Sequence, residues 1–413
     1  MAARRHVTNK LREAYRRASK QDKGRILDEV TTTTGMGRST ARRMLTGPPL
    51  PDPAGQVDRR ALRARRYSDD ARALLERLWA LMGMPCGKYL VVMLDLWLPL
   101  LQAAGDLGQA YATPAALAEL RAMSPATVDR YLAPTRARMQ VKGVSATRPS
   151  PLLRTSITVR KAGDELDGSP GMIEADTVAH CGPTLVGEFA RTLTMTDMAT
   201  GWTECASVRN NASRWVLGAV ELLADRFPFP VTGFDSDNGT EFINHDVAKW
   251  LGDRDVAFTR SRPYKKNDQA TVESKNNHVV RKHAFYWRYD TGEELDLLNQ
   301  MWPLVCLRLN FFTPTRKPTG YTTTTDGRRR RTYDRPATPW QRVQASGVLT
   351  EEQTTATAAR LDGINPADLT RQINTIQLTL TDLARDKTDT LTTARHLNLA
   401  PLTPSIRRLQ DPR

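Results

Sequence analysis

Three acidic residues have the types and spacing of a divalent metal site. Asp237 lies in FDSDNGTEF, residues 234–242, where Asn-Gly ends a short apolar strand. Glu273 follows after 35 intervening residues, and Asp176 lies upstream in GMIEADTVAHCG. Carboxylates that converge raise one another's pKa and become neutral unless a cation shares their charge. Hard oxygen ligands without a neighbouring Cys or His set indicate Mg²⁺ or Mn²⁺.

Other acids compete for these positions. Asp235 lies two residues from Asp237 on the same expected strand face, and Glu174 shares a face with Asp176 in an alternating run. Asp197 lies in an expected hairpin turn, where Asp is common for backbone reasons. The residues alone leave these alternatives open.

Strands and helices in alternation must position the three acids. A short apolar strand ending at Phe234 presents Asp237 at its C-terminal end, and a helix that begins at Asp268 carries Glu273. Three antiparallel strands followed by two parallel strands, interleaved with helices, predict a mixed α/β sheet. The expected elements are strands 172–179, 188–196 and 202–208, a helix capped at Ser213, strand 231–234, helix 245–251 and strand 256–259.

Part of this sequence resembles the catalytic core of the retroviral integrase and DDE transposase superfamily. The features that carry the resemblance are the string SDNGTEF, the interval of 35 residues, the upstream Asp176 and the segment RSRPYKKNDQATVESKN. The resemblance covers about residues 171–316, and the flanking segments are more loosely similar to a bacterial insertion-sequence transposase. It implies a ribonuclease H-like α/β core with a mixed five-stranded sheet and flanking helices. It also favours Asp237 over Asp235, because Asp237 precedes Asn-Gly and gives the family's interval to Glu273.

The resemblance implies an enzyme, a transposase or integrase that cuts the ends of a mobile element and joins their 3′-OH groups to target DNA. Asp176 would bridge two Mg²⁺ or Mn²⁺ ions, Asp237 would complete one site and Glu273 the other. Two such ions activate the nucleophile and stabilise the leaving oxygen of a phosphodiester. A same-fold metal-dependent nuclease and an inactive DNA-binding regulator derived from a transposase are the alternatives. No other cofactor is expected.

Composition predicts a polyanionic partner in a reducing compartment. The 413 residues include 60 Lys and Arg against 45 Asp and Glu, a formal charge of +15, which suits double-stranded DNA, both element ends and target. The four cysteines are scattered without a CxxC pair, so we expect buried thiols, no zinc and a bacterial cytoplasm, near the nucleoid. Retroviral integrases differ in carrying an N-terminal His/Cys zinc module. The basic start lacks the apolar run of a secretory signal, and Tyr89–Leu101 is too short to span a membrane and predicts a core helix.

Two helical hairpins before the core predict helix-turn-helix modules that bind DNA. In the first, within residues 10–45, Gly35 and Gly37 separate two helices and Ser39 caps the second. In the second, within 113–138, Ser124 is the expected N-cap. Each hairpin also fits a plain packing unit. The residues expected to face DNA are Ser39, Thr40, Arg42 and Arg43 in the first and Thr127 and Arg130 in the second.

Other polar and basic residues near the core are candidate DNA contacts. Lys265 and Lys266 lie in the loop before the helix of Glu273, and Asn277 and Arg281 follow Glu273 on the same expected helix face. A solvated charge, or a stem that covers apolar surface, is the alternative in each case. Four arginines in a flexible basic loop would contact backbone phosphates: Arg328, Arg329, Arg330 and Arg331.

The domain organisation follows from these segments. Leu369, Ile373, Ile376, Leu380 and Leu383 form a stripe near the C-terminus that suits helix pairing or packing within the chain. The resemblance suggests a homo-oligomer, at least a dimer on paired DNA ends, and no membrane partner. The predicted parts are a helix-turn-helix domain 1–47, a linker 48–58, a second helical and helix-turn-helix domain 59–140, a connector 141–170, the catalytic core 171–316, a basic loop 317–338 and a helical C-terminal region 339–413.

Overall fold

The computed structural model describes residues 2–49, 66–138, 158–160, 168–237, 239, 241–261, 270–323 and 329–397. The chain folds as two compact units, Met1–Arg66 and Tyr67–Arg413. In these described ranges, no helix combines the length and the apolar character needed to cross a membrane.

The first unit is a bundle of three helices, α1 (Ala2–Arg17), α2 (Lys20–Thr34) and α3 (Arg38–Thr46). The sequence predicted only two, because the polar and basic N-terminal segment has few apolar positions to reveal α1. The bundle has a small core of its own, formed by Tyr15, Leu27, Val30, Ala41 and Leu45.

Two glycines set the turn between α2 and α3. Gly35 has a left-handed φ of 65° and its N–H bonds the carbonyl of Thr31, which ends α2. Gly37 occupies the N-cap position of α3. The prediction that Ser39 caps this helix was therefore wrong: the N-cap lies two residues earlier, at a glycine that offers no side-chain acceptor.

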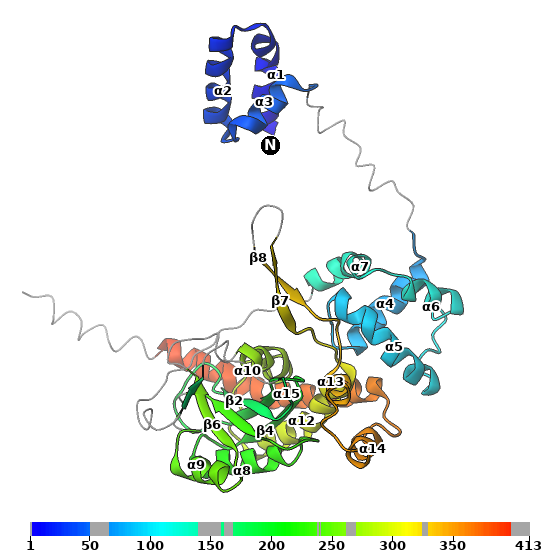
Figure 1. Ribbon diagram of the computed structural model, residues 1–413, viewed down its shortest axis with the longest axis vertical. Helices are drawn as coiled ribbons and strands as arrows, with labels where there is room; N and C mark the ends of the chain where they lie inside the picture. The colour runs from blue at the N-terminus through cyan, green and yellow to red at the C-terminus, as the bar shows by residue number, and fades with distance from the viewer. Residues whose placement is uncertain are drawn as a thin grey trace, which may run out of the picture. The chain divides into compact units, whose positions relative to one another are not determined.

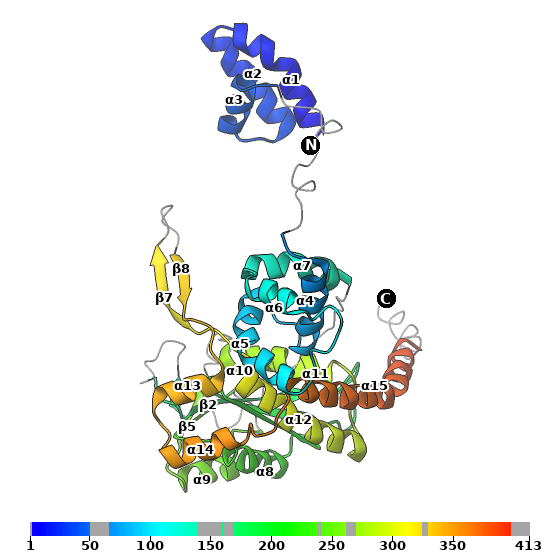
Figure 2. The same cartoon turned by 90° about the vertical axis from the view of Figure 1, so that its right-hand side faces the viewer.

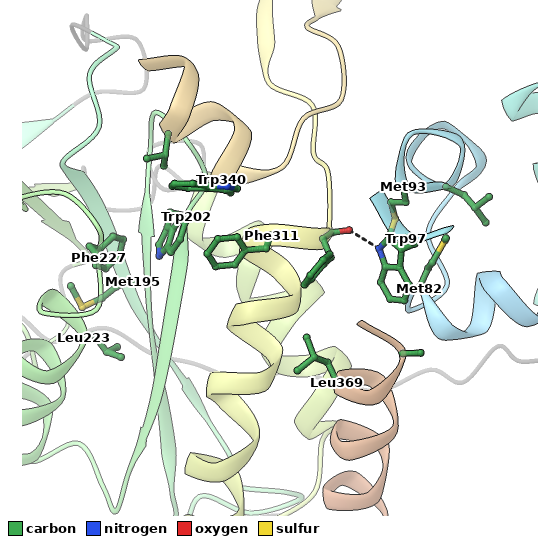
Figure 3. Packing of buried hydrophobic residues seen from close by; sticks show 14 of the residues in the cluster. Met82, Met93, Trp97, Met195, Trp202, Leu223, Phe227, Phe311, Trp340 and Leu369 are labelled. Atoms are coloured by element: carbon green, nitrogen blue, oxygen red, sulfur yellow. Dashed lines mark hydrogen bonds between the residues drawn. The ribbon is translucent and has the colours of Figure 1, made fainter. Parts of the chain in front are cut away.

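Four helices open the second unit: α4 (Asp69–Leu81), α5 (Gly87–Ala103), α6 (Pro114–Arg121) and α7 (Pro125–Arg138). Helix α5 confirms the predicted core helix, with Trp97 and Leu101 fully buried. The Trp97 indole Nε1 donates to the carbonyl of Phe312 at 3.1 Å, as Figure 3 shows. Side chains of α5 and of the sheet region belong to one apolar cluster, so these helices and the sheet share a core.

A mixed six-stranded sheet, in the order β1-β6-β5-β2-β3-β4, lies at the centre of the second unit (Figure 1). β2, β3 and β4 are antiparallel neighbours, and β5 and β6 run parallel to β2. Helices α8 and α9 lie on one face and α10 and α12 on the other (Figure 2). The bounds are β1 (Thr158–Arg160), β2 (Met172–Ala179), β3 (Arg191–Asp197), β4 (Thr203–Val208), α8 (Ser213–Ala224), β5 (Gly233–Ser236), α9 (His245–Gly252), β6 (Ala257–Ser261), α10 (Ala270–Lys275), the π-helical turn η3 (Asn276–Arg281), α11 (Lys282–Ala284) and α12 (Gly292–Phe312).

Two details of the sheet region differ from the sequence prediction. The strand β1 was assigned to the connector 141–170, since three residues are too few for a recognisable alternation, and it extends the predicted five strands by pairing in parallel with β6. Ser213 was expected to cap α8, but Ala212 holds the N-cap position and no side chain bonds the helix start.

The segment predicted to be a flexible basic loop, 317–338, contains an antiparallel hairpin of β7 (Pro318–Thr323) and β8 (Arg329–Tyr333). Its Thr and Tyr residues favour strands, a signal that the run of arginines hid. Both views show the hairpin projecting away from the sheet (Figure 1, Figure 2).

Helices α13 (Pro339–Ser346), α14 (Glu351–Ala359) and α15 (Pro366–Leu397) complete the described chain. Ile373 and Leu380 of α15 are buried in a cluster with Trp302 of α12. Leu383, at the end of the predicted stripe, is 38% exposed. Most of the stripe thus packs within the chain, so of the two predicted alternatives, packing within the chain is the correct one for most of its length.

Candidate active site

Strand register brings two of the predicted acids together. Ala175 of β2 pairs with Ser236, the last residue of the parallel strand β5. Asp176 follows Ala175 on β2, and Asp237 comes directly after the end of β5. Neighbouring strands lie roughly 4.8 Å apart, so the two carboxylates emerge side by side.

Hydrogen bonds orient both carboxylates. Asp176 Oδ1 accepts from its neighbour, the Thr177 N–H, at 2.7 Å, and Oδ2 accepts from Asn276 Nδ2 at 2.7 Å. Asp237 Oδ1 accepts from the Gly239 N–H at 2.7 Å. Each aspartate is half-buried, with a defined direction and limited access to water.

The pKa of both aspartates lies above the usual range. Desolvation is the main cause for Asp176, followed by the charge of Asp237, with smaller contributions from Glu241 and Glu273. Desolvation also leads for Asp237, followed by the charge of Glu241. Without a cation the cluster resists full ionisation, which is the electrostatic character of a cation site.

Glu241 is a fourth acid that the sequence reasoning missed. Its Oε1 accepts from Thr177 Oγ1 at 3.1 Å and lies 3.6 Å from Arg191 Nη1. It follows Asp237 by four residues within the motif that drew attention to Asp237, and that spacing was the available signal. The ion pair with Arg191 neutralises part of the charge beside Asp237.

Glu273 lies on α10, and contacts on either side of it hold this helix against β2. Glu174 Oε2 accepts from the Val272 N–H at 2.9 Å, and Asn276 donates to Asp176 as described. The Glu273 side chain itself is exposed. It lies near enough to raise the pKa of Asp176, but with a smaller effect than Asp237 has.

The competing acids have structural partners. Buried Glu174 fixes the start of α10. Asp235, also buried, accepts from Thr259 Oγ1 of the neighbouring strand at 2.6 Å. Asp197 accepts from the N–H groups of Gly171 and Thr200, which agrees with its interpretation as a turn former.

The helix of Glu273 changes its periodicity directly after α10. The turn η3 is π-helical, so the face expected from 3.6 residues per turn does not continue through Asn277 and Arg281. Asn276, which was not predicted, contacts Asp176 instead. Asn277 is exposed, and half-buried Arg281 stacks 5.0 Å from the Tyr286 ring centroid.

The other predicted DNA contacts are mostly at the surface. On α3, Ser39, Arg42 and Arg43 are exposed and Thr40 is half-buried. On α7, exposed Arg130 donates to half-buried Thr127 at 3.0 Å. In β8, Arg329, Arg330 and Arg331 are exposed, while Lys265, Lys266 and Arg328 lie outside the described residues.

A pocket of about 320 Å³ adjoins the acids through Arg191. Arg191 lines this pocket and also lies 3.6 Å from Glu241, so one side chain contacts both the pocket and the acidic cluster. Its lining mixes polar and apolar groups and consists of Gly187, Glu188, Phe189, Arg191, Asn210, Asn211 and Ala212.

The donors suit a divalent cation in their chemistry, although they do not form a finished cage. Among the residues that the structure describes, no three His, Cys, Asp or Glu side chains are grouped closely enough to hold a metal ion. Asn276 donates through Nδ2 to Asp176, while its Oδ1 is buried and has no hydrogen-bond partner in the described part of the chain. Asp176 and Asp237 thus fit a cation, and approach of the exposed Glu273 carboxylate would complete the set.

The sheet order, with Asp176 on β2 and Asp237 directly after the neighbouring strand β5, defines the class as an integrase catalytic core fold. A family model described as "Integrase core domain" matches residues 167–266. The uncharacterized protein y4rM of Sinorhizobium fredii (strain NBRC 101917 / NGR234) is 36% identical over 323 residues, 77% of this chain and 88% of that protein. The crystal structure of the catalytic core domain of BIV integrase matches at 16% identity with a TM-score of 0.26, over 34% of this chain and 84% of that chain. The chain belongs to the DDE transposase and retroviral integrase superfamily.

Proposed function

We propose that the protein is a DNA transposase or integrase of the bacterial cytoplasm that binds element ends, cleaves them at the 3′ side and joins them to target DNA. The observation that supports this most is the pair of Asp176 on β2 and Asp237 directly after the neighbouring strand β5, with raised pKa values, next to the helix that carries Glu273. A protein that only bound DNA would have little use for acids so close to phosphate.

In this proposal Asp176, Asp237 and Glu273 hold two Mg²⁺ or Mn²⁺ ions. When bound, such ions lower the pKa of a water or a DNA 3′-OH and stabilise the departing oxygen. Asn276 holds the Asp176 carboxylate in position, and Glu174 fixes the start of the helix that brings Glu273 to the site. No covalent bond between protein and DNA is required.

Basic side chains around the site would bind the DNA backbone. Arg191 and the pocket beside it would take the nucleotide next to the cleaved bond, with Arg281 further along the strand. Surface residues of α3 and α7 would recognise the element ends, and two copies of the chain would act on paired ends. The proposed DNA contacts in these helices and near α10 are Ser39, Thr40, Arg42, Arg43, Thr127, Arg130, Lys265, Lys266, Asn277 and Arg281.

The test is strand transfer by the Asp237→Asn variant. The substitution removes one negative charge from the cation site and leaves the helices of α3 and α7 unchanged. We therefore expect joining of DNA ends to fall below detection while end binding stays near the wild-type level. Retained joining activity would overturn the assignment.

A nuclease of the same fold is the alternative reaction. Pre-cut ends supplied with a target plasmid separate the two: a transposase joins the ends to the plasmid, whereas a nuclease only hydrolyses DNA. An inactive regulator would do neither and would bind DNA equally well with Asn at position 237.

A further inference from the structure

The hairpin β7–β8 has two chemically different faces. Tyr321 pairs with Arg331, and Thr322 pairs with Arg330. Because side chains alternate along a strand, Tyr321, Arg329 and Arg331 share one face, the aromatic face, and Thr322 and Arg330 lie on the opposite one, the threonine face.

Stacking organises the aromatic face. The guanidinium carbons of Arg329 and Arg331 lie 4.6 and 5.8 Å from the Tyr321 ring centroid, and Tyr321 is 55% exposed. Tyr333, two residues after Arg331, is also exposed and stacks with Arg316 at 5.1 Å. Stacking restricts the guanidinium groups without using their hydrogen-bond donors.

The base of the hairpin is fixed, while its length is open to solvent. Asp334 accepts from the Lys317 N–H at 2.7 Å and pairs with Arg342, and Lys317 Nζ donates to the carbonyl of Met198 in the turn between β3 and β4. Isolated two-stranded hairpins are marginally stable, so a partner along the ribbon would stabilise it. The described strand residues include three arginines and no acid, and this charge complements a polyanion.

We infer that the β7–β8 hairpin is a ribbon that lies in the major groove of duplex DNA with its aromatic face against the DNA. The inference rests on the proposed function and adds a binding surface to it. A major groove about 12 Å wide admits a two-stranded ribbon. Arg329 and Arg331, two residues apart on one face, are separated by roughly 6.6 Å along the strand, so the two guanidinium groups can contact different backbone phosphates.

The test compares two arginines that differ only in the face they occupy. Arg331→Ala and the matched control Arg330→Ala are made in the full-length chain carrying Asp237→Asn. Binding to a mixed-sequence duplex, and to one of its single strands, is measured over a range of salt concentrations. For Arg331→Ala we expect binding weaker by on the order of tenfold and a log–log salt slope smaller by about one, with little change for Arg330→Ala.

Three outcomes would overturn the ribbon. Equal losses of duplex binding in the two variants would mean that the arginines attract DNA through nonspecific charge and not through one face. Unchanged binding in both variants would mean that this surface does not contact DNA. A loss of binding only with single-stranded DNA would mean that the hairpin binds single strands and not the duplex. Failure of the proposed function can be distinguished from failure of this inference. If the proposed function is wrong, the wild-type chain shows no strand transfer, but Arg331→Ala still binds duplex DNA more weakly than Arg330→Ala.

Discussion

The acidic residues of the core differ in their roles because of their surroundings and not because of their residue type. Glu174 and Asp176 lie two residues apart on one face of β2. The first is buried and accepts from the start of α10, whereas the second faces Asp237 and has a raised pKa. One carboxylate therefore belongs to the fold and the other to the candidate site.

Conservative amides at these two positions should have opposite effects. Glu174→Gln keeps an oxygen that can accept from Val272, so we expect a folded protein with strand transfer within about tenfold of wild type. Asp176→Asn removes charge from the proposed cation site and should abolish joining. It should also abolish the rise in melting temperature that we expect Mn²⁺ to cause in the wild-type protein. Equal loss of activity in both variants would show that Glu174 is a ligand.

Glu241 is an alternative to Glu273 as the third acid of the site. The charge of Glu241 raises the pKa of Asp237, whereas the charge of Glu273 is not among the causes of that pKa shift. If Glu241 mainly pairs with Arg191 and Thr177, Glu241→Gln should lower joining by at most about tenfold, the loss of one charge-assisted contact. Glu273→Gln should abolish it. The two variants are compared on pre-cut ends at fixed Mg²⁺, and the reverse ranking would assign the third position to Glu241.

Sequence reasoning could propose the aspartates as candidates but could not predict the contacts that arrange them. Asp237 stands before Asn-Gly at a strand end, a local signal. Alternation alone left Asp176 and Glu174 open, and the family resemblance favoured Asp176. Asn276 and Arg191 reach the site only through the packing of η3 and β3 on β2, which no spacing along the chain encodes. Glu241 was visible in the motif, but its relevance depends on the turn that folds it back beside Asp237.

At the scale of elements, long periodic segments were predictable and short or irregular ones were not. The order of β2 to β6 and the core helix α5 follow from alternation and apolar runs. Two of the missed elements, the three-residue strand β1 and the charged hairpin β7–β8, depend on strand pairing, which outweighs intrinsic propensity. The third, the π-helical turn η3, depends on a local change of helix period.

The contact between β4 and α12 contains a titratable group that should make stability depend on pH. Glu204 is 2% exposed, and burial raises its pKa to about 7, above the ordinary value of 4.5. Its Oε1 accepts from Trp202 Nε1 at 2.8 Å and from Asn310 Nδ2 at 3.3 Å. Between pH 4.5 and about 7 the folded state keeps a proton that the unfolded chain has lost, so stability falls as the pH rises across this range and levels off above it.

Glu204→Gln should remove this part of the pH dependence, because the amide oxygen still accepts from Trp202 and cannot ionise. Between pH 4.5 and 8 we expect wild type to lose stability relative to the variant by on the order of 3 kcal/mol. Urea unfolding at several pH values measures the difference. Parallel pH profiles for the two proteins would mean that Glu204 is ionised in the folded state.

At the scale of the whole molecule, the chain is two units with separate cores. Leu45 is fully buried in the three-helix bundle, and its removal leaves a cavity that neighbouring side chains fill only in part. All eight tryptophans lie after residue 66, so tryptophan fluorescence reports only the second unit, whereas far-UV circular dichroism reports the helices of both.

Leu45→Ala should destabilise the first unit by about 2–5 kcal/mol and leave the second unchanged. We expect the melting curve by circular dichroism to gain or shift a low-temperature step, while the fluorescence transition stays at its wild-type temperature. Leu75→Ala, in the core of α4, is the reciprocal control and should shift the fluorescence transition. A fluorescence transition that moves with Leu45→Ala would mean that the two units unfold together, and the fold of the three-helix bundle would then depend on the stability of the second unit.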